Sequence, residues 1–157
     1  MQMVVGVVHN PILQETYTAT LGGGAFRNGE AIKVSGASEL RHALLATEIG
    51  TLRDNESVAA IFERVCAVVE PSRSIRQCGS CAMNMVGVAS GRLDAMFEIG
   101  FGGPWDIAAG LLPPPHCRRT ANYCSTVVIV AVPRHPTHTP PTPNNYAQLL
   151  QKLAVLR

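Results

Sequence analysis

A chain of 157 residues is long enough for one domain with a hydrophobic core and too short for two of ordinary size. Hydrophobic residues make up 46% of it and charged residues 15%, which is typical of globular proteins and excludes a disordered chain. All 11 acidic residues lie within residues 1–112, whereas residues 113–157 carry five scattered basic residues without an aromatic platform, so no nucleic-acid-binding module is expected.

The first part of the sequence predicts antiparallel hairpins. The valine-rich run Met3 to Val8 predicts a strand that stops at the turn signal Asn10-Pro11. Asn28-Gly29 is the strongest short-range hairpin signal and separates two further strands. Four strands are predicted here, at residues 3–8, 15–21, 25–26 and 31–34.

The middle of the sequence alternates strands and helices. Strands are predicted at residues 44–49, 74–78 and 94–99. A helix begins at Asn55 and ends at Pro71, with an apolar face of Val58, Ile61, Phe62, Val65 and Val69. Gly79-Ser80 opens a second helix, which ends at Gly91-Arg92 and buries Met83, Met85, Val86 and Ala89. These elements predict an α/β or α+β layered sandwich, with helices packed on a sheet that leans antiparallel.

Two carboxylates flank one glycine-rich loop. Glu98 ends an apolar run, and Asp106 lies in the segment Pro104-Trp105-Asp106 that opens the next apolar segment. A helix N-terminus with free backbone N–H groups is an anion site, and a carboxylate placed there can hold a cation beside a phosphate. The alternative is that Asp106 is an ordinary first-turn or capping residue.

Two motifs identify a resemblance to a known family. The segments G-S-C-A-M-N-M (79–85) and E-I-G-F-G-G-P-W-D-I-A-A-G (98–110), in that order after the opening hairpin, resemble the C-terminal half of the inositol monophosphatase family. The Gly-Phe-Gly-Gly-Pro variant is most similar to plant-type members, which act on L-galactose 1-phosphate as well as inositol monophosphates. The resemblance covers residues 3–112 and implies a partial inositol-monophosphatase-like fold and a phosphoric monoester hydrolase.

The resemblance also implies roles for individual residues. Asp106 corresponds to a carboxylate that binds the catalytic Mg²⁺, and Glu98 to the acidic residue that hydrogen-bonds the substrate hydroxyls. Gly79, Ser80 and Cys81 correspond to the helix start that lines the substrate pocket. These types suit the chemistry, because Mg²⁺ prefers carboxylate and water oxygens and polarises phosphoryl oxygens.

The sequence departs from the family in its acidic residues. Most metal ligands of the family come from a Glu-Glu stretch and an Asp-Pro-x-Asp-Gly-Thr motif, and neither occurs among these residues. A single carboxylate at Asp106 cannot hold two Mg²⁺ ions. The alternative function is therefore a catalytically incomplete fragment that acts by pairing with a full-length subunit, or as a homodimer.

The last 45 residues differ in kind from the rest. They contain eight of the 11 prolines and none of the 14 glycines. We expect a domain over residues 1–112 and a proline-rich, basic, poorly ordered tail over 113–157, with a lone strand at Val127–Val132 and a short helix at Tyr146–Leu156. Such a composition suggests an out-of-frame or unspliced reading, so a mispredicted transcript is one hypothesis.

Cysteine content and the absence of a leader predict a cytoplasmic protein with free thiols. The pair Cys78 and Cys81 has the spacing of half a zinc site. The later candidate ligands, His116, Cys117 and Cys124, lack the spacing of the other half, so a zinc site is not expected. A position at a helix start predicts a lowered pKa for the Cys81 thiol. No apolar run is long enough for a membrane span, so we expect neither a membrane nor a nucleic acid as partner.

Overall fold

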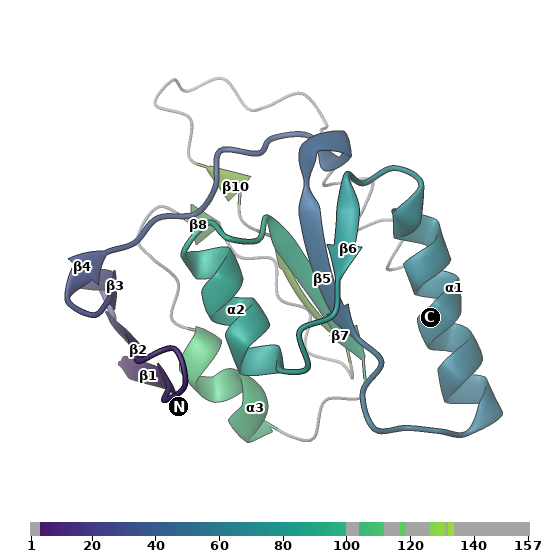
Figure 1. The fold of residues 1–157 in the computed structure, drawn as a ribbon, viewed down its shortest axis with the longest axis horizontal. Helices are drawn as coiled ribbons and strands as arrows, with labels where there is room; N and C mark the ends of the chain where they lie inside the picture. Colours follow the sequence, from purple (N-terminus) through teal and green to yellow (C-terminus); the bar gives the residue numbers. More distant parts are fainter. Residues whose placement is uncertain (1–3, 100–103, 112–116, 119–125, 131, 134–157) are drawn as a thin grey trace.

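The computed structural model describes residues 4–99, 104–111, 117–118, 126–130 and 132–133. Its elements form four layers (Figure 1): helix α1 (Asn55–Val69), a central sheet, a layer of the helices α2 (Cys81–Ala89) and α3 (Pro104–Ala108), and an N-terminal sheet. The predicted mixture of sheets and packed helices is confirmed. Within the described ranges, no helix has the length and apolar character needed to cross a membrane.

The N-terminal sheet is antiparallel, as the hairpin signals predict. Its strands lie in sequence order: β1 (Val5–Asn10), β2 (Glu15–Thr20), β3 (Gly24–Arg27) and β4 (Glu30–Ala31). Asn28 and Gly29 both have positive φ, at 51° and 85°, which is what the tight turn between β3 and β4 requires. The fourth strand is shorter than the predicted 31–34, because pairing stops at Ala31.

The central sheet is largely parallel, so the predicted antiparallel lean is wrong for this layer. Its order is β6 (Ser74–Arg76), β5 (Leu44–Glu48), β7 (Ala95–Ile99) and β9 (Thr126–Val130). Strand β5 runs parallel to both β6 and β7, because α1 and α2 supply the long crossovers that parallel neighbours need. Strand β9 pairs antiparallel with β7, so the apolar patch near residue 127 is not a lone strand.

The remaining elements are short. They are the 3₁₀ helices η1 (Leu40–His42) and η2 (Ala109–Leu111) and the strands β8 (Cys117–Arg118) and β10 (Val132–Pro133), which pair with each other. The helix predicted at Tyr146–Leu156 lies outside the described residues.

The central sheet buries side chains on both faces. The face toward α1 carries a cluster that includes Leu45 and Phe97, packed against Val68 of the helix. The face toward α2 and α3 carries Ala46 and Met96, packed with further side chains: Met85, Val88, Leu93 and Ile107. Alternate residues of β5 and β7 thus face opposite layers, as the period of two along a strand requires.

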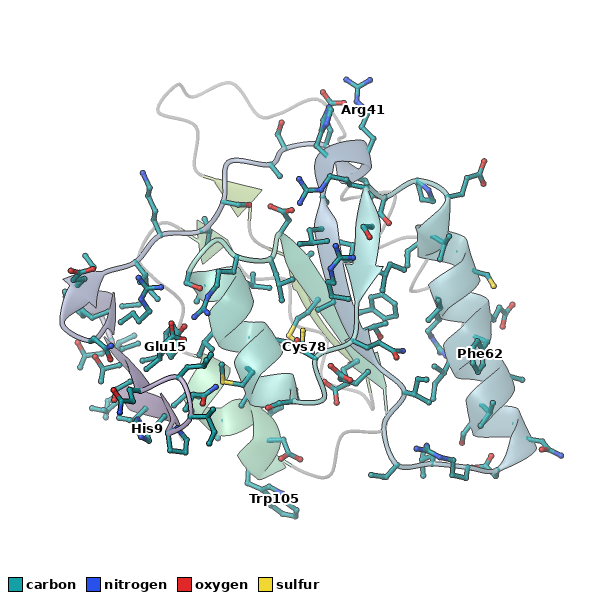
Figure 2. The ribbon with its side chains drawn as sticks, viewed as in Figure 1. His9, Glu15, Arg41, Phe62, Cys78 and Trp105 are labelled. Atoms are coloured by element: carbon teal, nitrogen blue, oxygen red, sulfur yellow. The ribbon has the colours of Figure 1, made fainter. Side chains whose placement is uncertain are left out.

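The helix faces follow the prediction only in part. In α1, Ile61 is buried as expected, but Phe62 and Val69 are about half exposed, and Figure 2 shows Phe62 on the outer side of the helix. In α2, Met85 and Val86 are buried as predicted, whereas Met83 and Ala89 are only half-buried. Helix α1 begins at an N-cap, Asp54, whose carboxylate accepts a hydrogen bond from the Ser57 N–H at 2.8 Å.

A polar contact ties the N-terminal sheet to the helix layer. The Arg92 guanidinium, beyond the end of α2, donates to Glu15 Oε2 of β2 at 2.7 Å and lies 5.6 Å from the centroid of the Tyr17 ring. The Tyr17 hydroxyl donates to the same carboxylate oxygen at 2.8 Å. The turn before Arg92 uses Gly91 at φ 75°, as the predicted helix end requires.

Candidate active site

The candidate site lies where the carboxyl ends of β5 and β7 meet, at one edge of the central sheet. Because β5 and β7 are parallel, their carboxyl ends meet at the same edge, and Glu48 pairs in register with Glu98. Both residues lie on the sheet face toward α2, since Glu98 is two positions along its strand from Met96 and Glu48 is two positions along its strand from Ala46. Helix α2 begins at this edge, and Asp106 of α3 lies near enough for its charge to raise the pKa of Glu98. The fold thus brings Cys81, Glu98 and Asp106 together.

Glu98 is a buried carboxylate, with only 5% of its surface exposed. It has a side-chain hydrogen bond with Cys81, while its Oε2 atom has no hydrogen-bond partner among the described residues. Burial raises the pKa of Glu98, and the Glu48 and Asp106 carboxylates add to the rise against the opposing effect of the Cys81 bond. A buried oxygen without a partner is costly, so its role in binding substrate hydroxyls stays a prediction.

Cys81 differs from the expectation of a lowered pKa. Burial raises the pKa of its thiol far above the ordinary range, and the hydrogen bond with Glu98 and the charges of Glu98, Asp106 and Glu48 raise it further. The helix N-terminus favours the thiolate, but desolvation and three neighbouring carboxylates outweigh it. Cys81 is therefore a thiol at neutral pH and a hydrogen-bonding group of the site.

We expect the cysteines to differ in their rates of alkylation. At pH 8, Cys81 reacts with iodoacetamide at least about 10-fold more slowly than the exposed Cys66 and Cys78, because the thiolate is the nucleophile. Peptide mass spectrometry after timed quenching measures the three rates in one sample. An equal rate at Cys81 and Cys66 would contradict the raised pKa.

Gly79 and Ser80 form the entry to α2. Gly79 has φ 79°, a conformation that favours glycine, and its N–H donates to Glu48 Oε1 at 2.9 Å. Ser80 is the N-cap, and its hydroxyl accepts a hydrogen bond from the Met83 N–H at 3.3 Å. The Gly79 N–H is therefore occupied by the protein itself, and its role in substrate binding stays a prediction, as does that of Ser80.

Asp106 lies in the first turn of α3 and is half-buried. This position is consistent with either of its two interpretations, as a first-turn acid or as a metal ligand. The neighbouring Trp105 is 73% exposed and projects away from the body of the protein (Figure 2). The electrostatic contacts of Asp106 with Cys81 and Glu98 favour a role in the site.

The described residues do not complete a metal site. Across residues 4–99 and the shorter described segments, no group of three or more His, Cys, Asp or Glu side chains is placed to hold a metal ion. The other two aspartates have structural partners elsewhere: Asp54 caps α1, and Asp94 accepts a hydrogen bond from the Leu44 N–H. The role of Asp106 as a Mg²⁺ ligand therefore stays a prediction.

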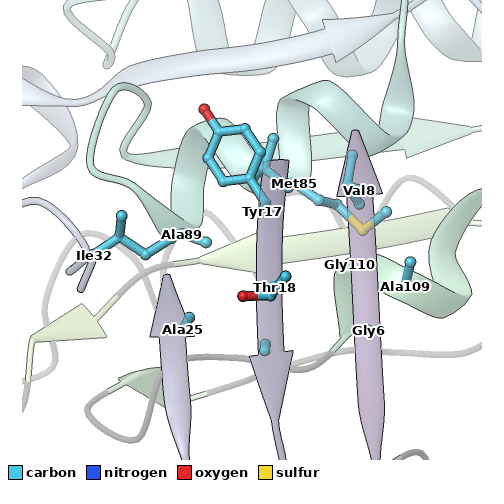
Figure 3. Close-up of a pocket in the computed structure, with 12 residues that line it drawn as sticks. Gly6, Val8, Tyr17, Thr18, Ala25, Ile32, Met85, Ala89, Ala109 and Gly110 are labelled. Carbon is cyan, nitrogen blue, oxygen red and sulfur yellow. The ribbon is translucent and has the colours of Figure 1, made fainter. Parts of the chain in front are cut away.

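A small apolar pocket lies apart from this edge. It is formed where β1, β2 and β3 face α2 and η2 (Figure 3), and its lining includes Val8, Tyr17, Met85 and Gly110. A Cβ atom on Gly110 would come within 2.6 Å of Met85, so the two elements are in close contact there. None of the predicted site residues lines this pocket.

Two residues that the structure places beside Glu98 and α2, Glu48 and Asn84, are not predicted from the sequence. Asn84 is fully buried, and its Nδ2 group donates to Glu48 Oε1 at 2.8 Å. The signal for Glu48 was present: a carboxylate that follows an apolar strand within a strand-helix-strand-helix-strand pattern. That pattern predicts parallel strands, which would place Glu48 beside Glu98.

Comparison with known proteins agrees with this architecture. The family model described as "Inositol monophosphatase family" matches residues 1–112. Inositol monophosphatase 2 of Solanum lycopersicum is 57% identical over 109 residues, which are 69% of this chain and 41% of that protein. Inositol monophosphatase 1 of Rattus norvegicus is 37% identical over 115 residues, which are 71% of this chain and 40% of that protein. The chain thus spans about two fifths of the length of these curated relatives.

Solved structures show the same likeness. Mycobacterium tuberculosis SuhB superposes with a TM-score of 0.78 at 31% identity, over 98% of this chain and 59% of that one. The inositol monophosphatase from Anabaena superposes with a TM-score of 0.74 at 28% identity, over 98% of this chain and 60% of that one. The sequence match and the shared fold lead to one conclusion: this chain belongs to the inositol monophosphatase family.

Proposed function

We propose that this chain contributes the substrate side of a Mg²⁺-dependent phosphomonoesterase that hydrolyses inositol monophosphate or a related sugar phosphate such as L-galactose 1-phosphate. The observation that carries the proposal is the buried Glu98, whose free Oε2 lies at an edge shared with Asp106 and the start of α2. Hydroxyl groups of a polyol donate hydrogen bonds to such an oxygen.

Each residue of the site has a proposed task. Glu98 accepts hydrogen bonds from substrate hydroxyls, and the segment Gly79 to Cys81 forms the adjoining wall. Asp106 supplies one carboxylate ligand for Mg²⁺, an ion that stabilises charge on the phosphoryl oxygens when bound. The remaining carboxylate ligands are proposed to come from a partner chain, such as a second copy of this one, because every Asp and Glu of this chain lies within the described residues.

The direct test is phosphate release by the purified chain from inositol 1-phosphate and L-galactose 1-phosphate, in Mg²⁺ and in EDTA. We expect release in Mg²⁺ and none in EDTA. In Asp106→Asn the rate of release should fall at least about 100-fold, because removing even an indirect supporting partner of a metal lowers metal affinity or activity 10–100-fold. Asp54→Asn is the matched control, since Asp54 is the N-cap of α1 and asparagine also caps a helix.

A folded wild-type sample that releases no phosphate at any Mg²⁺ concentration would contradict hydrolysis by this chain alone. Circular dichroism establishes that the sample is folded. Equal losses in Asp106→Asn and Asp54→Asn would also count against the proposal, because they would show a general effect of removing a charge.

A second candidate function is pairing with a full-length inositol monophosphatase subunit. It is favoured by β1, which lies at an edge of its sheet. Two of its valines, Val5 and Val7, have 60% and 52% of their surface exposed. The facing side chains of β2, Thr18 and Thr20, are exposed as well. Among the described residues nothing covers this face, and an edge strand with exposed valines favours association.

Pairing is tested with inositol monophosphatase 2 of Solanum lycopersicum as the full-length subunit. We expect a mixed species of one chain each in size-exclusion chromatography with light scattering, and its loss in the double variant Val5→Lys, Val7→Lys. The control Glu39→Lys adds positive charge at a half-exposed site by η1. Two separate peaks with the wild-type chain would exclude this candidate.

A further inference from the structure

Glu48 makes an unusual set of contacts for a residue at the end of a strand. Its Oε1 atom accepts three hydrogen bonds: from the Cys78 N–H at 2.8 Å, from the Gly79 N–H at 2.9 Å, and from Asn84 Nδ2 at 2.8 Å. The donors lie 30 to 36 residues away in the sequence. A single carboxylate oxygen therefore joins β5 to the loop before α2 and to the helix itself.

These contacts fix the backbone that precedes the helix. Gly79 has a left-handed conformation, and nothing lies within 4 Å of where its Cβ would be, so no neighbouring atom supports the turn at that point. Asn84 is fully buried one turn into α2, and its backbone N–H donates to the Ser80 carbonyl. The loop and the first helical turn are thus anchored at one point.

Helix capping alone does not account for Glu48. Ser80 already caps α2 through its hydroxyl, and the two amides that Glu48 binds precede the helix. A carboxylate here also lies near Glu98 and Asp106, which is electrostatically unfavourable. The three converging hydrogen bonds offset this repulsion, because hydrogen bonds to an ionised group are roughly twice as strong as neutral ones.

We infer that Glu48 is a positioning residue, which holds the segment from Cys78 to Ser80 and the start of α2 so that Cys81 and Glu98 face the substrate in fixed geometry. The inference rests on the proposed function, because it gives Glu48 a task in that same site. Glu48 acts through its neighbours and makes no contact with the reacting phosphate. The essential property is the reach of its oxygen to three donors.

Two substitutions separate reach from charge. Glu48→Asp keeps the negative charge but is one methylene too short to reach the three donors, whereas Glu48→Gln keeps the length and one acceptor oxygen but removes the charge. The same two changes at Glu39, a half-exposed residue paired with Arg41, are the matched controls. Thermal melting and circular dichroism confirm that each variant is folded.

Two measurements are made on each variant. Amide hydrogen exchange reports whether Cys78 and Gly79 are protected, and calorimetric titration with inositol 1-phosphate in Mg²⁺ reports affinity. We expect exchange at both amides to quicken at least about 10-fold in Glu48→Asp and the dissociation constant to rise by a similar factor, since one lost charge-assisted bond accounts for about that much. Glu48→Gln weakens these bonds but keeps their reach and relieves the repulsion from Glu98, so we expect a smaller change than in Glu48→Asp in both measurements.

The outcomes are distinguishable. Loss of amide protection with unchanged affinity in Glu48→Asp would overturn the inference, because the anchor would then serve only the fold. A defect in Glu48→Gln as large as in Glu48→Asp, with the amides still protected, would also overturn it, because charge and not reach would then matter. Failure of the wild-type chain to bind inositol 1-phosphate would refute the proposed function itself, and the inference with it.

Discussion

Replacing Phe97 with alanine is expected to lower the free energy of unfolding by about 3–5 kcal/mol, which is the usual cost of truncating a buried phenylalanine. Phe97 lies on β7 with 2% of its surface exposed and belongs to the cluster between the central sheet and α1. Its truncation removes apolar contacts and leaves a cavity that rigid strands on either side cannot fill. With a total stability of about 5–15 kcal/mol for a domain, this loss is large.

Urea unfolding followed by circular dichroism measures the effect as a lower midpoint with an unchanged slope. Phe62→Ala is the matched control, because Phe62 is 51% exposed on the outer side of α1 and alanine favours a helix. We expect its stability to stay within about 0.5 kcal/mol of wild type. Similar losses at the two positions would contradict the assignment of the core to the inner face of α1.

Local signals in the sequence predict the elements well. The Asn28-Gly29 pair predicts the turn between β3 and β4 because few other residue pairs adopt positive φ twice in succession. Ser80 predicts the start of α2 because a serine hydroxyl accepts the orphan amide of the first turn. Such signals act within four residues and need no knowledge of the fold.

Properties that depend on tertiary contacts are predicted poorly. Periodicity in α1 fits a face through Phe62 as well as one through Val68, and only packing against Phe97 and Leu45 decides between them. The pKa of Cys81 is another case, since the helix end predicts a lowered value and burial beside Glu98 raises it. In both cases the contacts that decide come from strands far away in the sequence.

The candidate site follows the same division. Glu98 and Asp106 are found from the sequence because they flank one loop, and the family motif spans both. Glu48 is missed because its nearness to Glu98 depends on parallel pairing of β5 with β7. A prediction that derives parallel strands from the two helical crossovers would have found it.

Replacing Glu98 with glutamine is expected to stabilise the chain at pH 8 by about 1–3 kcal/mol, because it removes a buried charge that lies near the charges of Glu48 and Asp106. Burial and the charges of Glu48 and Asp106 raise the pKa of Glu98 above its ordinary value of 4.5. The folded state therefore binds a proton more readily than the unfolded state. Wild-type stability then falls as the pH rises above about 4.5 and levels off above the folded pKa.

The difference in stability between Glu98→Gln and wild type isolates this effect from the other carboxylates. We expect this difference to be small at pH 4, to grow with pH and to reach a plateau. It is measured by urea unfolding, in EDTA so that no divalent cation compensates the charge of Glu98. Glu15→Gln is a control of opposite sign, because Glu15 is paired with Arg92 at 2.7 Å and its charge is favourable. A Glu98→Gln difference that is constant from pH 4 to pH 8 would show that the site does not raise the pKa of Glu98. The same charge that destabilises the free chain is what a polyol or a cation would compensate, so ligand binding and stability at this edge are expected to rise together.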